Sequence, residues 1–466
     1  MIAFALRLAW LFQPMRYDES ITFLDTASSG FWPAWSQYGA NNHVLHTLLV
    51  RLCTLWTSRE WAIRLPAFVA GVLTPWVAYL VGRQLFDRGA ALIGAALVAC
   101  SAALIEYSTN ARGYSMVTLF TLLQVMLADR IARTARHRDL ASFALVSAAG
   151  LFTIPTMLYP TITTLAWALL IAGTRSSQTP WRKLMLRAPL YVALGLLLVA
   201  LLYTPVLLQK DGWHNLTDNK WIAPIDTFSG WRHALRGLTV GLWKEWSYGL
   251  TKAGLGLAIA FAIIAVIAYA SRRNMRAMWV VVALVVCVGM MAVQRVAPFV
   301  RVFLFALPLL LLTAAAGLSM LISQRWAMRA ALGLCVGLAI YDVASHAPDR
   351  ASAFDKFPQA KAVIAFLLPH IDRPDDATVF GVVASAPTRY ERFRTGQPPI
   401  PYRPGARRLW LVTRYDDAPA HVLYSNRLRA DFFKKPKLVF KQGVAEVYEL
   451  IPLAGRTPRQ HRQPRP

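Results

Sequence analysis

Four long stretches of this chain carry no charged residue, and each is about as long as a membrane-crossing helix. They cover residues 190–208, 253–270, 277–293 and 302–322. A bilayer core about 30 Å thick needs roughly 20 apolar residues per helix. The whole chain is 56% hydrophobic and only 16% charged, with a mean hydropathy of +0.40, which is outside the usual range for a soluble domain. We therefore expect most of it to lie in lipid.

Weaker apolar segments extend this pattern to about eleven transmembrane helices. The predicted spans are 1–13, 62–82, 91–107, 114–131, 141–157, 158–172, 189–208, 251–270, 277–293, 302–322 and 327–344. The expected fold class is thus a polytopic α-helical membrane protein.

The basic residues between the spans indicate the topology. Alternate short connections are rich in arginine: Arg83 and Arg88; Arg130, Arg133, Arg136 and Arg138; Arg175, Arg182, Lys183 and Arg187; Arg272, Arg273 and Arg276; Arg325 and Arg329. The positive-inside rule places such short basic loops in the cytoplasm. The N-terminus is then cytoplasmic, and the connections 14–61, 108–113, 210–250 and 294–301 face outward, as does the chain after 344.

The composition changes after residue 344. Apolar runs at 378–384, 408–413, 438–441 and 444–450 alternate with turn-forming clusters, which predicts a small α/β domain. We expect a transmembrane catalytic domain at 1–344, an outer α/β domain at 345–454, and a disordered tail rich in Arg, Pro and Gln at 455–466.

The formal charge of +26 does not indicate nucleic-acid binding, because the basic residues form short groups between apolar spans. The four cysteines, Cys53, Cys100, Cys287 and Cys335, are scattered without CxxC spacing. Neither a disulfide framework nor a zinc site is expected.

An acidic pair, Asp18 and Glu19, opens the first outer loop directly after the first span. The same loop has apolar residues at helical spacing in 21–27 and 41–49, and tryptophans between these two segments. This pattern predicts helices that lie along the membrane interface. On its own the acidic pair is equally compatible with a solvated helix end.

The second of these interfacial segments contains Asn42, His43 and His46. The two histidines stand at i and i+3, so they share one face of a helix. Two histidines and an acid are compatible with a divalent metal ion, but hydrogen bonding to a sugar or a phosphate is the favoured role.

The most polar short connection between two spans is the next outer turn, residues 106–114. It contains Glu106, Tyr107, Arg112 and Tyr114. An arginine at an outer helix end either snorkels to the interface or grips a phosphate through two parallel hydrogen bonds. The tyrosines suit sugar binding or anchoring at the interface. A further cation, Arg301, lies at another outer boundary.

These segments together resemble the N-terminal half of GT-C superfamily glycosyltransferases. The motifs are Tyr17-Asp18-Glu19, Asn42-His43, Ala62-Ile63-Arg64-Leu65-Pro66, Tyr107-Ser108 and Ala111-Arg112-Gly113-Tyr114, with a fainter match from Arg301 to Pro308. The similarity is greatest over about residues 15–130 and is closest to the bacterial branch related to protein O-mannosyltransferases and the aminoarabinose–lipid A transferase. Thr109-Asn110 stands where many relatives have Gln-Glu, which leaves the position of a second acid open.

The resemblance implies an inverting transfer of a sugar from a polyprenyl-phosphate donor to an envelope acceptor, which is a glycan, a lipid or a protein. It implies a bacterial inner-membrane location, with the active site on the outer face. Asp18 is then the base, and Glu19 orients Asp18 or the acceptor, or binds a metal ion if one is present. We expect Asn42, His43, His46, Arg64, Glu106, Tyr107, Arg112, Tyr114 and Arg301 to bind substrate. No organic cofactor is implied, and a divalent ion remains open.

Two other classes remain as alternatives. A transporter or flippase of a lipid-linked saccharide normally carries ionisable residues near the bilayer midplane, whereas the charges here gather at helix ends. A non-enzymatic scaffold would not depend on Asp18.

Overall fold

The computed structural model describes most of the chain. The described residues are 1–322 except 40, 175–177, 218–221 and 223; residues 330, 333, 334, 337, 340, 341, 344 and 345; and 356–453 except 371–375, 398–407, 427 and 429. They form two compact units. The first contains Met1–Leu11, Ser29–Leu55 and Trp61–Ser352, and the second contains Phe12–Ser28, Trp56–Glu60 and Ala353–Pro466.

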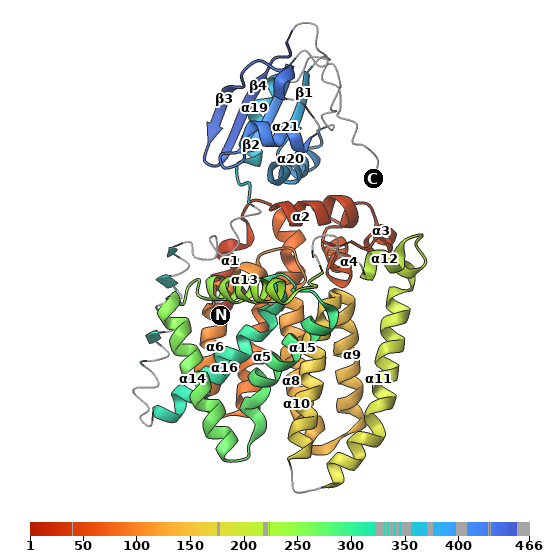
Figure 1. The fold of residues 1–466 in the computed structure, drawn as a ribbon, viewed down its shortest axis with the longest axis vertical. Coiled ribbons are helices and arrows are strands. Elements are labelled where there is room, and N and C mark those ends of the chain that lie inside the picture. The colour runs from red at the N-terminus through yellow and green to blue at the C-terminus, as the bar shows by residue number, and fades with distance from the viewer. Residues whose placement is uncertain are drawn as a thin grey trace. The chain divides into compact units, whose positions relative to one another are not determined.

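The first unit is a helical bundle (Figure 1). Its helices are α1 (Ile2–Leu11), α3 (Phe31–Ser36), α4 (Val44–Cys53), α5 (Glu60–Leu85), α6 (Arg88–Cys100), α7 (Ala102–Ser108), α8 (Tyr114–Thr134), α9 (His137–Thr153), α10 (Leu158–Gly173), α11 (Gln178–Leu207), α12 (Gly212–Thr217), α13 (Phe228–Trp246), α14 (Thr251–Ser271), α15 (Trp279–Gln294) and α16 (Leu307–Leu321). Short 3-10 turns, η2 (Pro155–Met157), η3 (Met275–Met278) and η4 (Val300–Ala306), lead into α10, α15 and α16.

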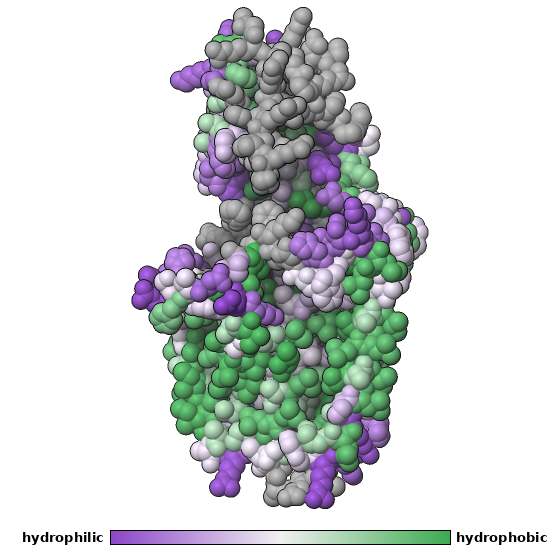
Figure 2. All heavy atoms as spheres, turned by 45° about the vertical axis from the view of Figure 1, so that its right-hand side comes forward, coloured by the Kyte–Doolittle hydropathy of each residue, from purple (hydrophilic) through white to green (hydrophobic). Residues whose placement is uncertain are grey.

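Seven helices in the described part of the chain are long and apolar enough to cross a membrane, or eight if α6 and α7 form one bent span. The spans of α8 and α16 are 78% and 83% buried, whereas those of α11, α14 and α15 are 17–28% buried. The first two therefore form the centre of the bundle, and the last three present apolar surface outward. Figure 2 shows that surface as a continuous apolar belt, bordered along its lower edge by hydrophilic side chains.

These features confirm a polytopic helical membrane protein, while the number of eleven spans stays a prediction. The expected first span is the ten-residue helix α1, and the expected span at 141–157 is the seventeen-residue helix α9. Most of the expected last span, 327–344, lies outside the described residues, as does the tail 455–466.

The segment expected as one straight span at 91–107 is broken. The chain bends by 58° between α6 and α7, and Arg7 of α1 lies in the bend with its side chain fully buried. Its Nη1 donates to the Ala99 carbonyl at 2.9 Å, and its Nε donates to the Ser108 hydroxyl at 3.1 Å. Arg7 thus satisfies a carbonyl that the break leaves without its usual helical partner, and it fixes the end of α7.

The connection 210–250, which the sequence placed outside the membrane as a large loop, contains the 19-residue helix α13. This helix lies across the bundle rather than along it (Figure 1). Trp231, Leu235, Leu238 and Leu242 recur at helical spacing and pack against the core of the bundle. Arg232 and Arg236 between them, and Lys244 after them, lower the hydropathy of the segment, so a search for apolar spans passes over it.

The second unit combines the C-terminal α/β domain with two short N-terminal segments. The N-terminal part is α2 (Tyr17–Thr22), which continues as a π-helical turn, η1 (Phe23–Ala27). The C-terminal domain contains α19 (Ala360–Leu367), η6 (Leu368–His370), β1 (Asp376–Phe380), α20 (Val382–Arg394), β2 (Arg408–Arg414), α21 (Pro419–Ser425), η7 (Ala430–Phe432), β3 (Lys437–Gln442) and β4 (Ala445–Leu450).

The four strands form one sheet in the order β1-β2-β4-β3. β1 pairs in parallel with β2, with Asp376 opposite Arg408, and the other two pairings are antiparallel. Alternate residues of β2 enter two apolar clusters: Leu409 and Leu411 enter one, and Trp410 and Val412 the other. Both faces of this central strand are therefore covered, and the predicted small α/β domain is confirmed. Its exact boundaries, 345 and 454, stay predictions.

Candidate functional site

The turn between α7 and α8 meets the start of α4 through a single histidine. His43 Nδ1 accepts a 2.7 Å hydrogen bond from the Gly113 backbone amide. Beside it, Nη2 of Arg112 lies 3.4 Å from His43 Nε2, and Nη1 of Arg112 donates to the Asn41 side-chain oxygen at 3.2 Å. The structure thus brings together two predicted site residues that are 69 positions apart in the sequence.

The hydrogen bond from Gly113 fixes the protonation state of His43. A neutral imidazole has one N–H, so if Nδ1 accepts, Nε2 carries the hydrogen. Burial, followed by the charges of Arg112, His46 and Arg301, lowers the pKa of His43 well below its ordinary value of 6.5. His43 is therefore neutral at physiological pH. Its Nε2–H and the Arg112 guanidinium are two neighbouring donors, because an arginine cannot accept a hydrogen bond.

Aromatic rings line this pair of donors. Tyr114 packs edge-on to the His43 ring at 5.0 Å between centroids and to Tyr107 at 5.4 Å. The Arg112 guanidinium carbon lies 5.8 Å from the centre of the Tyr114 ring. Both tyrosines are buried. They have few alternative rotamers in this packing, so they hold His43 and Arg112 in a defined geometry.

Glu245, near the end of α13, is an acid that the sequence did not single out. Its carboxylate accepts a hydrogen bond from the Tyr107 hydroxyl and lies within the electrostatic reach of Arg301. Burial raises the pKa of Glu245 to about 7, and the Tyr107 hydroxyl and the Arg301 charge limit that rise. The i, i+4, i+7 pattern of apolar residues in α13 is the sequence signal that would have placed Glu245 on a helix.

The remaining predicted residues of the first unit are mostly buried in packing contacts. Asn42 donates to the Gln37 carbonyl at 2.5 Å, which closes the loop before α4. Arg64 donates to the Leu11 carbonyl at 3.0 Å, which ties α5 to the end of α1. His46 and Glu106 are 0% and 1% exposed. A substrate-binding role for these four stays a prediction.

The acidic pair lies in the second unit. Asp18 is half-buried on α2, while Glu19 is fully buried. Oε2 of Glu19 accepts a 3.0 Å hydrogen bond from the Arg16 backbone amide. Glu19 thus supports the first turn of the helix that carries Asp18, which fits the predicted orienting role. A meeting of Asp18 and Arg112, which belong to different units, stays a prediction.

The side chains do not suit the metal site that the sequence left open. Among the residues that the structure describes, no three His, Cys, Asp or Glu side chains come together as metal ligands do. His43 is also a poor ligand, because Nδ1 accepts from the Gly113 amide and Nε2, beside the Arg112 cation, carries the hydrogen and has no free lone pair. We therefore derive no catalytic step from a metal ion.

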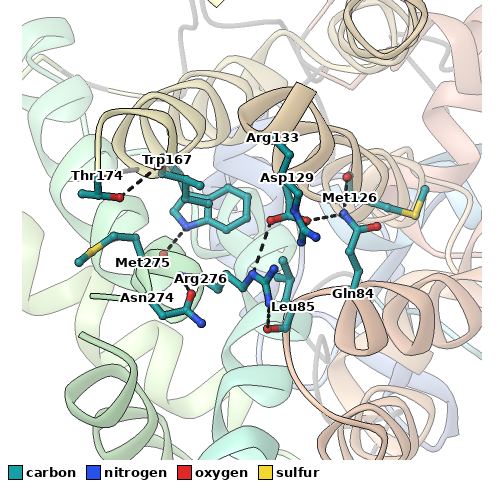
Figure 3. Close-up of polar contacts among 11 residues, drawn as sticks. Gln84, Leu85, Met126, Asp129, Arg133, Trp167, Thr174, Asn274, Met275 and Arg276 are labelled. Atoms are coloured by element: carbon teal, nitrogen blue, oxygen red, sulfur yellow. Dashed lines mark hydrogen bonds and ion pairs between the residues drawn. The ribbon is translucent and has the colours of Figure 1, made fainter. Parts of the chain in front are cut away.

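A second polar cluster surrounds Asp129 near the other end of α8 (Figure 3). The Asp129 carboxylate is fully buried and pairs with Arg133 one turn on, and with Nε of Arg276 at 3.7 Å. The Gln84 amide also donates to it at 2.8 Å. At 1.5 Å per residue, Asp129 lies roughly 20 Å along the helix from Tyr114. This cluster therefore braces α5, α8 and η3 and is separate from the candidate site.

The helices and the site define a multi-pass membrane protein with a basic, aromatic-lined site between α4, α7, α8, η4 and α13. Comparison with solved structures identifies its fold. The chain is similar to ArnT from Cupriavidus metallidurans in the apo state, with a TM-score of 0.62 and 12% identity over 95% of this chain and 96% of that one. It is also similar to ArnT from Cupriavidus metallidurans bound to undecaprenyl phosphate, with a TM-score of 0.57 and 12% identity over 96% of each chain.

A family model provides a second, independent match. Residues 44–208 match the family described as dolichyl-phosphate-mannose-protein mannosyltransferase. No curated protein sequence matches the chain at significant similarity. The predicted GT-C-like fold is confirmed by the similarity to ArnT. The family match over residues 44–208 agrees with the part of the sequence that carries the resemblance.

Proposed function

We propose that this protein is a glycosyltransferase of the bacterial inner membrane that takes its sugar from a polyprenyl-phosphate donor. The observation that carries the proposal is the pair of donors made by Arg112 and the neutral His43. Two N–H groups on one side of a buried, aromatic-lined site suit an anionic phosphate oxygen. The solved ArnT complex with undecaprenyl phosphate supports the same class of ligand.

The donors would act on the leaving group. When an acceptor hydroxyl attacks the anomeric carbon, the bond between that carbon and the phosphate oxygen breaks, and the lipid phosphate departs with the bonding electrons. Arg112, His43 and Arg301 would stabilise the charge that develops on this phosphate. Tyr107 and Tyr114 would hold the arginines in place and contact the sugar.

Asp18 would act at the other end of the reaction. The attacking hydroxyl must lose its proton to a base within about 3 Å, and a carboxylate on α2 is suited to accept it. A single displacement of this kind inverts the anomeric centre. Glu19 keeps Asp18 oriented through the first turn of α2. The active site would face the periplasm, where lipid-linked donors replace nucleotide sugars.

The binding step can be tested with undecaprenyl phosphate itself. Arg112→Gln should weaken its binding to the purified protein in detergent by roughly tenfold to a hundredfold, as expected for a lost charge-assisted hydrogen bond. Arg295→Gln is the matched control, because Arg295 lies in the same unit but is 67% exposed and pairs with Asp226. Equal affinities in the two variants would contradict the proposed phosphate site.

The reaction and the acceptor can be tested in cells. Mass spectrometry of envelope glycans, lipids and proteins from a deletion strain and its parent should show one sugar missing from one acceptor. If the same sugar instead accumulates on its lipid carrier at the inner leaflet, the alternative function of a flippase is favoured.

A further inference from the structure

Helix α20 of the C-terminal domain packs against the helical segment that carries the acidic pair. The contact centres on Phe23, which is 2% exposed although it comes from a short outer segment. Its ring meets Tyr390 edge-on at 5.9 Å and Phe393 edge-on at 5.6 Å, both from α20. Such edge-on aromatic pairs stabilise a contact beyond the effect of the area that they bury.

Polar contacts surround this aromatic centre. Nη2 of Arg389 donates to Oδ1 of Asp25 at 3.1 Å. The Tyr390 hydroxyl donates to the Ser58 carbonyl at 2.6 Å, so the same residue of α20 also holds the segment 56–60. The charge of Arg389 also acts on Tyr17, which is the neighbour of Asp18 in the chain. α20 therefore contacts the segment 17–27 at Phe23 and Asp25, and the charge of Arg389 extends its influence to Tyr17.

The backbone of the acidic segment, residues 17–27, has an unusual conformation at the point where α20 contacts it. After α2 the chain changes to a π-helical turn, η1, in which the Ser28 amide donates to the Phe23 carbonyl at 2.8 Å. Single π-turns are rare and occur frequently at functional sites. The residue at which the π-turn begins is Phe23, the residue that α20 holds. External packing thus supports an unusual turn directly after the helix of Asp18.

We propose that α20 is a positioning element for the Asp18 carboxylate, with Arg389, Tyr390 and Phe393 as its positioning residues. The inference rests on the proposed function, because it takes Asp18 as the base. Under this inference the C-terminal α/β domain affects the rate of sugar transfer and does not affect the affinity for the donor. An error of about 1 Å in the place of a catalytic group costs up to a hundredfold in rate, so an anchor outside the bundle would control the reaction.

The test combines a loosened contact with a rescue. The double variant Arg389→Asp with Phe393→Ala removes the ion pair and one aromatic partner. Phe393 is 47% exposed, Arg389 and Asp25 are about half exposed, and neither Phe393 nor Arg389 belongs to the two apolar clusters of the sheet. The rescue is the exchanged pair, Asp25→Arg with Arg389→Asp, and it is compared with Arg389→Asp alone, so that the restored ion pair is the only difference. The control is Lys441→Gln, which removes the ion pair between Lys441 of β3, whose side chain is 59% exposed, and Glu446 of β4 in the same domain.

Three quantities are measured for each full-length variant: the sugar restored to the envelope of the deletion strain per amount of enzyme, the affinity for undecaprenyl phosphate, and amide hydrogen exchange in residues 17–27. The loosened variant should lose roughly tenfold or more in sugar transfer, keep its affinity within about twofold, and exchange faster in residues 17–27. The exchanged pair should recover most of the transfer, and the control should behave as the wild type.

Transfer within about twofold of the wild type, or unchanged exchange in residues 17–27, would overturn the positioning role. Full activity of Asp18→Asn would instead overturn the proposed function. If Asp18→Asn is inactive while the loosened variant is active, only the inference about α20 fails. The exchange measurement does not depend on any assumption about the reaction.

Discussion

The Gly113 amide donates a 2.7 Å hydrogen bond to Nδ1 of His43, and this bond joins the turn before α8 to the start of α4. It requires His43 to carry its hydrogen on Nε2, next to Arg112. One backbone bond therefore determines which face of the imidazole is available to a ligand. The proposed recognition of phosphate by His43 and Arg112 depends on this hydrogen bond.

Gly113→Ala should weaken undecaprenyl phosphate binding, because it disturbs the hydrogen bond from residue 113 to His43. A Cβ at Gly113 would lie 2.5 Å from Cγ2 of Thr153 and 3.1 Å from His43 Nδ1. We expect a loss of about tenfold, measured by titration of the purified protein, because the turn must shift away from α9 and the imidazole loses its partner. Combining it with Thr153→Ser removes the closest atom and should recover part of the affinity. An unaltered affinity for Gly113→Ala would show that the geometry of this turn is not needed.

Glu245→Gln should change the pH dependence of stability. The folded-state pKa of Glu245 is raised from 4.5 to about 7, so the folded state holds this proton more tightly than the unfolded state does. The stability that this group contributes is therefore present below pH 4.5 and is lost as the pH rises towards 7. Glutamine keeps an acceptor for Tyr107 but cannot ionise.

Thermal unfolding in detergent at pH 5 and pH 8 measures this effect. The variant should be more stable than the wild type at pH 8, by about 1–3 kcal/mol, with a smaller difference at pH 5. Asp226→Asn, which removes a carboxylate that is 64% exposed, serves as the control and should show no such trend. A difference that is the same at both pH values would contradict the assignment of Glu245 as a buried, titrating acid.

Asp129→Asn should lower stability without affecting the candidate site. The substitution weakens the ion pairs with Arg133 and Arg276, whose side chains are 35% and 26% exposed and can regain water. We expect a loss of about 1–2 kcal/mol in thermal unfolding. Undecaprenyl phosphate affinity should stay within about twofold of the wild type, because the cluster lies at the opposite end of α8. A large loss of affinity would contradict this prediction, because it would show that the Asp129 cluster and the candidate site are energetically coupled.

The fold class followed from the sequence because apolar length and charge position are local properties. Spans such as 302–322 could be recognised without knowledge of their neighbours. The bend at Ser101 and the helix α13 could not be recognised from the sequence, because each depends on tertiary partners. Arg7 stabilises the first, and the core of the bundle holds the second.

The candidate site was predicted only in part, because some of its residues belong to recognisable sequence motifs whereas others matter only through tertiary packing. His43 and Arg112 were identified from motif resemblance, and the structure joins them through Gly113. Glu245 was missed because a glutamate in an outer connection usually indicates a solvated surface. The pKa of Glu245 is raised only because its side chain is buried beside Tyr107, and this burial depends on tertiary packing that cannot be read from the sequence. The position of Phe23 against α20, 370 residues away at Phe393, was beyond local reasoning in the same way.

In the proposed reaction Asp18 removes the proton of the acceptor hydroxyl, and Asp18→Asn separates this step from donor binding. The measurement is sugar transfer to the envelope acceptor in the deletion strain, with undecaprenyl phosphate affinity determined on the same purified variant. Transfer should fall by roughly a thousandfold or more, while affinity and thermal stability stay near those of the wild type. Transfer at the wild-type level would show that Asp18 is not the base.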